Sequence, residues 1–538
     1  MEASFKKSYA SLGADRLVLL WLGVWWIANL VQAGFTELAN DEAYYHMFAE
    51  RLAWGYFDHP PVTALLVWAG ERLFGGELGV RFFFTVLQPL YLWILWRLIR
   101  PADAGRRDAA LFVVVSAATL MLQLYGFIAV PDGPLMFTTA LFLLTFKWFS
   151  ENRRRAWLWM GIAMALMAYS KYHGALVVLF ALAANPRQLL RPALYSSGAV
   201  ALLLLVPHLV WQYEHDWASF AYHLSGRNSV FRPGYVVEFL ANMLVVFNPF
   251  FVLSSLRGYV QPQWVIVSCF GLVYVLFAYA RRHPRTRRYV MRAGGVTVGL
   301  IVLVRLVMIF NPLGIRFEVF NNPESYAAIA AEADGRPVVF RYGYAVAAKY
   351  AFYTGGEAYC QPNIRYRTHQ WKFRDDDSQF IGREVLVECP DGTVSDSTRQ
   401  VRTLTMANGR SFTWFVDPAF HPVRLVDIAF TGLPGRVAAG ETLRLELRIT
   451  NPYPYAIRVG ADDTQLVMLW KHGRFRVDEF PTGETFTIPA DSELTRGVTF
   501  TVLPQLAGET FDVGFALRRE GYTNWFNGKS VPTKVGNL

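Results

Sequence analysis

The sequence predicts a polytopic α-helical membrane protein of about 9–11 spans, followed by a water-soluble C-terminal portion. Three observations predict this class. Long apolar runs dominate the chain before Asn311, whereas the sequence after Pro323 reads as an ordinary soluble protein. Hydrophobic residues make up 53% of the chain, and a soluble core could bury one such run but not all of them. Short arginine clusters separate the runs, as the positive-inside rule predicts for cytoplasmic loops.

The formal net charge of +10 comes largely from these clusters. They are Arg97 with Arg100, Arg106 and Arg107; Arg153–Arg155; Arg187 with Arg191; and Arg281–Arg288. Because their placement between apolar runs explains the charge, nucleic acid is excluded as a partner. Lys6, Lys7 and Arg16 place the N-terminus inside, and the first apolar run is expected to remain as an anchor because no small-residue cleavage site follows it.

The apolar runs give the candidate spans 17–35, 80–98, 108–128, 134–150, 156–172, 174–190, 193–212, 263–280 and 289–311. A further apolar segment at 235–256 is interrupted by Asn248-Pro249, and we interpret it as a re-entrant or interfacial element. This threading places the C-terminal portion outside the cytoplasm. The loops 36–79, 129–133, 170–174 and 213–262 are expected on the same outer side.

The soluble portion is predicted to hold two domains after the membrane domain of residues 1–320. Residues 321–420 are expected to form an α/β unit, with strands at Val338–Phe340 and Val385–Val387 and a helix at Ala345–Tyr353. Residues 421–538 alternate apolar and polar side chains, as in Leu443–Ile449, which predicts a β-sandwich of immunoglobulin-like type. Cys360 and Cys389 are available for a disulfide if this portion is external.

Two short motifs in the first outer loop carry groups suited to chemistry. Asp41 and Glu42 are adjacent carboxylates just beyond a span, which suits a general base and its support. Asp58 and His59 precede the rigid Pro60-Pro61 and can hold a metal or a phosphate in a fixed position. Taken singly, each motif favours a solvated interfacial helix or a turn over a catalytic role.

Further ionisable groups fall on the same predicted side of the membrane. Asp132 lies between two prolines, Lys171 and His173 lie between two spans, and a polar aromatic stretch runs from Trp211 to Arg227. Such residues also serve as interfacial anchors. Their convergence on one face favours a catalytic cleft.

These segments together resemble the membrane glycosyltransferases of the GT-C fold, over about residues 36–320. More narrowly, they look like the bacterial branch of this fold that is related to protein O-mannosyltransferases and to the lipid A aminoarabinose transferase. The motifs are Asp41-Glu42-Ala43-Tyr44-Tyr45, Asp58-His59-Pro60-Pro61, Pro131-Asp132-Gly133-Pro134, Lys171-Tyr172-His173 and the stretch 211–227. The resemblance implies transfer of a sugar from a polyprenyl-phosphate donor to an envelope glycan, glycolipid or protein hydroxyl outside a bacterial cytoplasmic membrane. It implies no nucleotide, and no phosphate-cradling glycine loop is present.

The resemblance also implies a role for each matching residue. Asp41 corresponds to the catalytic base, Glu42 to its support and Asp132 to a second acid that orients the acceptor or the base. Asp58 and His223 match positions that look like metal ligands, so a divalent cation is one expectation. His59 replaces a lysine of the relatives, which leaves its role open between metal and phosphate. The remaining assignments are donor phosphate for His59, Lys171, His173 and Arg227, and acceptor for Tyr44 and Tyr45.

Other functions remain open at this point. A lipid-linked oligosaccharide ligase or polymerase would use a similar outer cleft, whereas a transporter should show polar groups at mid-membrane and internal repeats. In the soluble portion, Trp470, Trp525 and Phe526 are the aromatic residues considered for stacking on sugar rings, although residues of these types belong more often to the core.

Overall fold

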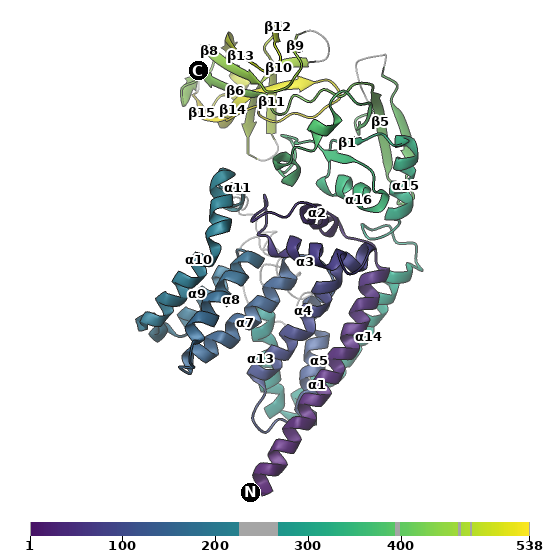
Figure 1. Ribbon diagram of the computed structural model, residues 1–538, viewed down its shortest axis with the longest axis vertical. Coiled ribbons are helices and arrows are strands. Elements are labelled where there is room, and N and C mark those ends of the chain that lie inside the picture. Colours follow the sequence, from purple (N-terminus) through teal and green to yellow (C-terminus); the bar gives the residue numbers. More distant parts are fainter. Residues whose placement is uncertain (1, 225–266, 393–398, 461–463, 474–475, 537–538) are drawn as a thin grey trace. The chain divides into compact units, whose positions relative to one another are not determined.

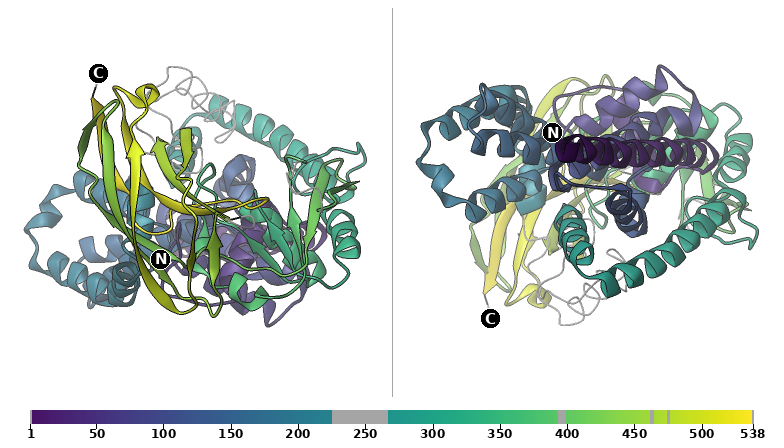
Figure 2. Two further views of the ribbon diagram at one scale, coloured as in Figure 1. Left: turned by 90° about the horizontal axis from the view of Figure 1, so that it is seen from above. Right: turned by 90° about the horizontal axis from the view of Figure 1, so that it is seen from below.

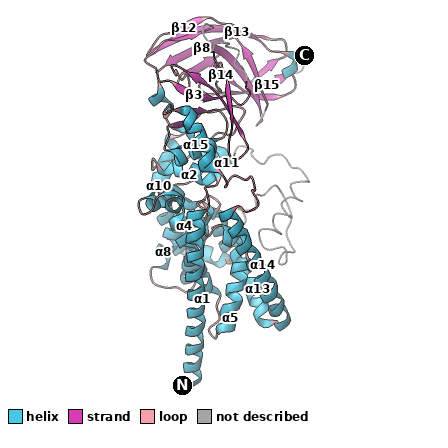
Figure 3. Cartoon of the chain, turned by 90° about the vertical axis from the view of Figure 1, so that its right-hand side faces the viewer, coloured by secondary structure: helices cyan, strands magenta, loops and turns pink. Residues whose placement is uncertain are grey.

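The computed structural model describes residues 2–224, 267–392, 399–460, 464–473 and 476–536 (Figure 1). The chain divides into two compact units, Met1–Phe320 and Asn321–Leu538. The first unit is helical and the second contains all of the described strands (Figure 3). The polytopic helical class with a C-terminal β-rich portion is therefore confirmed.

Four described helices are long and apolar enough to cross a membrane. They are α1 (Glu2–Phe35), α4 (Gly76–Ile99), α10 (Pro192–Glu214) and α14 (Pro284–Phe310), and they match the predicted spans 17–35, 80–98, 193–212 and 289–311. Shorter helices occupy the other predicted spans, namely α5 (Arg106–Ala118), α6 (Leu120–Leu124), α7 (Asp132–Ser150), α8 (Ala156–Ser170), α9 (Gly174–Ala184) and α13 (Ser268–Arg282). The predicted re-entrant element at 235–256 lies outside the described residues.

Two predicted spans are not continuous helices. The run 108–128 breaks at Thr119, whose backbone is extended between α5 and α6. Side chains satisfy carbonyls that the break exposes, because Gln123 donates to the Ser116 carbonyl at 3.0 Å and Arg305 donates to the Gln123 carbonyl at 3.1 Å. The run 174–190 ends as α9 at Ala184, and the 3-10 helix η1 (Pro186–Leu190) follows because Pro186 cannot continue the helical hydrogen bonding.

The core of the first unit lies between α1, α4, α5, α7 and α13. Leu22, Leu95, Phe112, Met136 and Phe277 belong to one buried cluster. Two short helices, α2 (Asn40–Ala49) and α3 (Val62–Glu71), connect α1 to α4. A Cβ at Gly70 would stand 2.2 Å from the Gly79 carbonyl oxygen, so only glycine allows this tight passage from α3 into α4.

The second unit begins with a mixed sheet of order β2-β1-β3-β5-β4. The parallel strands β1 (Val338–Phe340), β2 (Ala358–Cys360) and β3 (Val385–Glu388) continue into antiparallel β5 (Ser411–Asp417) and β4 (Arg402–Thr405). Helices α15 (Asn322–Ala333) and α16 (Tyr344–Thr354) complete the α/β part. Both predicted strands and the predicted helix are confirmed. The three cysteines are buried, and Cys360 and Cys389 form no disulfide.

A β-sandwich follows, drawn in green to yellow in Figure 2. One sheet has the order β11-β10-β14-β15-β7 and the other β13-β8-β6, with the short pair β12-β9 beside them. The strands are β6 (Asp427–Thr431), β7 (Arg436–Ala438), β8 (Thr442–Asn451), β9 (Ile457–Val459), β10 (Thr464–His472), β11 (Arg476–Pro481), β12 (Phe486–Ile488), β13 (Ser492–Thr501), β14 (Thr510–Arg519) and β15 (Val531–Gly536). Every second residue of β8 from Leu443 to Ile449 is buried, as alternation requires. Trp470 is fully buried in this core, so of its two interpretations the core residue is the one observed.

Candidate active site

A buried ion pair between Glu42 and Arg81 holds the first turn of α2, which carries Asp41. The Glu42 carboxylate accepts hydrogen bonds from Arg81 Nε at 2.6 Å and Nη2 at 2.5 Å. It also accepts from the backbone amides of Ala39 at 2.9 Å and Ala129 at 2.8 Å. Arg81 further donates to carbonyl oxygens at the end of α1, including that of Ala33 at 3.0 Å. Both side chains are almost completely buried. Glu42 therefore ties the start of α2 to α1, α4 and the loop before α7, and supports the site by position.

Asp41 differs from its neighbour in being exposed. It lies in the first turn of α2, where the helix N-terminus favours a carboxylate. Its charge acts on both Asp132 and the Tyr125 hydroxyl, which places these three groups in one neighbourhood. An exposed carboxylate next to a second acid is suited to take a proton from a bound hydroxyl.

Asp132 and Lys171 form the second ion pair of the site. Asp132 begins α7 and Lys171 follows the end of α8. Lys171 Nζ donates to both carboxylate oxygens, at 2.8 and 2.9 Å, and both residues are buried. From the sequence, Asp132 is expected to orient the acceptor or the base, and Lys171 to bind the donor phosphate. In the structure each is the counter-ion of the other, so a phosphate would share Lys171 with Asp132.

Rings from four separate segments form what we call the histidine cluster: Tyr45, His59, Tyr172 and His223. The ring centroids of Tyr45 and His59 are 5.4 Å apart, those of His59 and His223 6.5 Å, and those of Tyr172 and His223 5.5 Å. His223 lies on the short helix α11 (Ala218–Leu224), and its Nε2–H donates to the Asp58 backbone carbonyl at 3.0 Å. The structure thus gathers residues that the sequence placed in three different outer loops.

His173 lies beside this cluster in a charge environment that opposes protonation. Burial, together with the nearby cation of Lys171 and the His223 ring, lowers the pKa of His173 to about 4. The imidazole is therefore neutral near pH 7 and would meet a phosphate as a hydrogen-bond donor, not as a cation. Tyr44 is fully buried against Phe48, with ring centroids 4.7 Å apart, so its side chain offers no surface to an acceptor. Arg227 lies outside the described residues.

The predicted metal ligands do not form a complete set in the described part of the chain. There, no three His, Cys, Asp or Glu side chains gather as a metal site would require. His223 contacts Asp58 at its backbone carbonyl, at 3.0 Å. These residues do not fit a three-ligand centre, and no catalytic step is assigned to a metal.

A hydrogen-bonded network behind the histidine cluster was not predicted. Gln212 on α10 donates to the Tyr172 hydroxyl at 3.1 Å and to Ser219 Oγ at 2.7 Å. Ser219 Oγ donates to the Tyr56 carbonyl at 2.7 Å, and His208 pairs with both the Tyr172 hydroxyl at 3.0 Å and the Trp54 carbonyl at 2.7 Å. The network holds the loop 54–59 against the loop 171–173. His208 and Gln212 are four residues apart and therefore lie on one face of a helix, and this spacing could have indicated the network from the sequence.

Arg305 is a second residue that the sequence analysis missed. It lies inside α14, donates to Asn29 Oδ1 at 2.9 Å, and its guanidinium lies 5.0 Å from the ring centroid of Trp25 and 5.2 Å from that of Phe127. A lone arginine in an apolar helix is the signal that would have singled it out. Its contacts join α14 to α1 and to the broken segment after α5.

The chain is similar to known proteins in sequence and in fold. Residues 58–211 match the dolichyl-phosphate-mannose-protein mannosyltransferase family. The chain is 28% identical over 189 residues to the lipopolysaccharide core galacturonosyltransferase RgtA of Rhizobium johnstonii, which covers 32% of this chain and 37% of RgtA. The chain thus spans about a third of the length of this curated relative.

The fold is similar to that of ArnT from Cupriavidus metallidurans. The apo structure superposes with a TM-score of 0.50 at 15% identity, and the structure bound to undecaprenyl phosphate with 0.51 at 16%. Each comparison covers 74% of this chain and 97% of ArnT. The predicted GT-C fold is therefore confirmed.

Proposed function

We propose that this chain, a GT-C fold protein related to ArnT and to the protein O-mannosyltransferases, is a glycosyltransferase that uses a polyprenyl-phosphate-linked sugar. The acceptor is a hydroxyl of lipid A or core sugar, a surface polysaccharide or a protein, on the outer side of a bacterial cytoplasmic membrane. The observation that carries the proposal is the meeting of Asp41 with the Asp132–Lys171 pair at one end of the helical unit. The similarity to an ArnT structure bound to undecaprenyl phosphate supports a lipid-phosphate donor.

Asp41 acts as the general base in this proposal. The acceptor oxygen attacks the anomeric carbon of the donor sugar and loses its proton to the Asp41 carboxylate. The bond between the anomeric carbon and the phosphate oxygen breaks, and both of its electrons leave with the polyprenyl phosphate. Only a side chain open to solvent can meet an incoming acceptor, and Asp41 is exposed while Glu42 is not.

Lys171 stabilises the departing phosphate. As negative charge develops on the leaving oxygen, the Lys171 ammonium can offer a hydrogen bond while it stays paired with Asp132. The pairing keeps the ammonium in place before the substrate binds, so little reorganisation is needed during the reaction. His173 adds a neutral hydrogen-bond donor. For His59, binding of the donor phosphate stays a prediction from the sequence.

The test is a transfer assay with purified full-length protein. A panel of radiolabelled polyprenyl-phosphate sugars is incubated with envelope extract as acceptor, with and without divalent cations or EDTA. Asp41→Asn should lower transfer by about 10²–10⁴-fold, the usual contribution of a general base, and leave the melting temperature unchanged because Asp41 is exposed. Glu50→Gln, at an exposed carboxylate at the other end of α2, is the matched control and should retain activity.

Full transfer by Asp41→Asn would contradict the assignment of the base. A folded protein that transfers none of the donors, even with longer lipid-linked glycans, would favour the ligase or transporter alternatives. The transporter alternative also predicts that donor lipid moves across vesicle membranes without acceptor, which a fluorescent lipid-phosphate flip assay would detect.

A further inference from the structure

A cavity in the second unit lies between the α/β part and the sandwich, far along the sequence from the residues of the proposed chemistry. It has a volume of about 120 Å³. At about 30 Å³ per water, it would hold about four waters, so it can take the carboxylate-bearing edge of one sugar ring. Its lining combines cationic, aromatic and hydroxyl groups, namely Tyr359, Lys372, Arg424, Arg519, Tyr522 and Trp525.

The arginines that line the cavity are already neutralised. Arg424 donates to Asp377 at 2.7 Å and to Asp375 at 3.0 Å. Arg519 donates to Asp417 at 3.4 Å and to the His421 carbonyl at 2.9 Å. These contacts join the two parts of the unit and build the wall of the cavity. The ammonium of Lys372 is a further positive charge in this lining, and its surroundings differ from those of the arginines.

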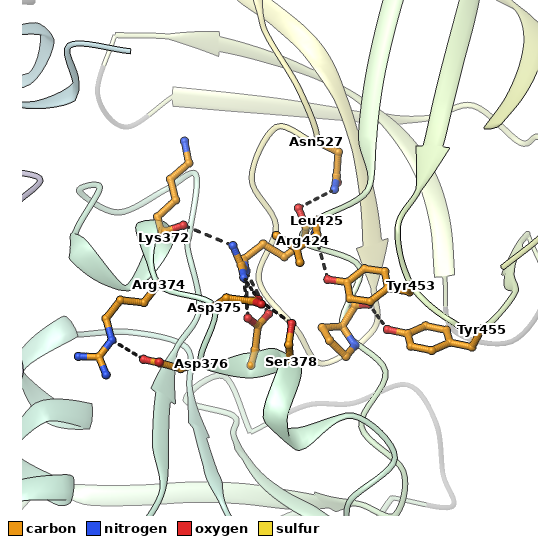
Figure 4. Close-up of polar contacts among 12 residues, drawn as sticks. Lys372, Arg374, Asp375, Asp376, Ser378, Arg424, Leu425, Tyr453, Tyr455 and Asn527 are labelled. Atoms are coloured by element: carbon orange, nitrogen blue, oxygen red, sulfur yellow. Dashed lines mark hydrogen bonds and ion pairs between the residues drawn. The ribbon is translucent and has the colours of Figure 1, made fainter. Parts of the chain in front are cut away.

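Lys372 has no carboxylate partner within the described residues. Its backbone carbonyl accepts a hydrogen bond from Arg424, while its side chain points away from the cluster of Asp375 and Arg424 (Figure 4). The ammonium lies 4.7 Å from the ring centroid of Trp525, and the ammonium of Lys471 lies 4.6 Å from the same ring. Burial, together with the charges of Lys471 and Arg424, lowers the pKa of Lys372 to about 8. Two cations therefore share one indole ring, an arrangement that an anion would relieve.

Tyr359 supplies an independent sign of a ligand. It lies on β2, is 1% exposed and lines the cavity, and its hydroxyl is buried without a hydrogen-bond partner. A buried hydroxyl of this kind costs free energy unless a ligand or water satisfies it. An oxygen-rich ligand in the cavity would provide that partner.

We propose that this cavity binds an acidic sugar residue of a glycan. The sugar carboxylate takes the ammonium of Lys372, a ring oxygen or hydroxyl pairs with Tyr359, and the apolar face of the sugar lies against Trp525. A free inorganic anion would use the charge but not the indole. Trp525 thus has the sugar-stacking role that its residue type suggested. The ammonium groups of Lys372 and Lys471 beside it favour a negatively charged sugar. The site is one of recognition, and binding there requires no transfer chemistry.

The test is isothermal titration of the full-length protein, in a detergent without a sugar headgroup. The ligands are trigalacturonic acid, the neutral galactotriose and inorganic phosphate. We expect trigalacturonic acid to bind at least about tenfold more tightly than galactotriose, with an affinity that falls as salt is added. Lys372→Met should weaken this binding by about tenfold or more.

Tyr359→Phe is the second variant, and it is chosen because it cannot unfold the protein by breaking a native hydrogen bond. It should retain the melting temperature and weaken trigalacturonic acid binding by about two- to tenfold. Lys529→Met, at an exposed lysine of the same unit, is the charge-matched control and should bind normally. Asp41→Asn should also bind normally, so a failure of the proposed transfer reaction would leave this result intact.

Three outcomes would overturn the proposal. They are equal affinity for galactotriose and trigalacturonic acid, binding of phosphate alone, and unchanged affinity in folded Lys372→Met and Tyr359→Phe.

Discussion

Replacing Arg81 by methionine should destabilise the helical unit strongly, because it leaves the Glu42 carboxylate buried without its counter-ion. Removing one partner of a buried, hydrogen-bonded pair costs about 3–5 kcal/mol. The upper part of this range applies here, since Arg81 also supports the carbonyl of Ala33 and both side chains are almost completely buried. At about 2 °C per kcal/mol for a unit of this size, the melting temperature should fall by roughly 8–10 °C.

The assay is thermal unfolding of the purified full-length protein, followed by intrinsic fluorescence, for Arg81→Met, Glu42→Gln and the double variant. The double variant removes both charges, so it should lose less stability than the two single variants added together. A coupling free energy of about 1–3 kcal/mol is expected. Arg97→Met, at an exposed position of the same helix α4, is the matched control and should stay within about 0.5 kcal/mol of the parent.

Two results would refute this reasoning. One is a melting temperature of Arg81→Met no lower than that of Arg97→Met. The other is a double variant whose loss equals the sum of the single losses, because the pair would then contribute no interaction of its own.

The remaining predictions concern the second ion pair, the network and the buried imidazole. Lys171→Met should lower both transfer and stability, and adding Asp132→Asn should restore part of the stability but no transfer; a double variant no more stable than Lys171→Met would contradict the pairing. Ser219→Ala should cost about 1–3 kcal/mol in thermal unfolding, because it removes a buried donor and leaves Gln212 short of a partner. Burial lowers the pKa of His369 to about 3, so the unfolded chain binds a proton below about pH 6.5 that the folded chain does not. Stability should therefore fall as the pH drops from about 6.5 towards 3, and His369→Leu should flatten this dependence in unfolding measured at several pH values.

Much of the architecture could be predicted from local sequence patterns. The apolar runs located the helices α1, α4, α10 and α14, because a membrane span must satisfy its backbone within one continuous helix. Alternation along β8 indicated the sandwich, because successive side chains of a strand point to opposite faces. The break at Thr119 was not predicted. It depends on hydrogen bonds from distant side chains, such as that of Arg305, to backbone carbonyls, and composition does not reveal such bonds.

The sequence by itself determined the class of fold, the order of the outer motifs and the identity of the ionisable residues they carry. Only the tertiary structure decided their partners. It pairs Glu42 with Arg81 and Asp132 with Lys171, each across 39 residues, and leaves Asp41 exposed between them. It also places Lys372 and Lys471 on one tryptophan ring. The physical reason is that helical and strand periodicity are local properties of the chain, whereas burial and charge pairing depend on which distant segments pack together.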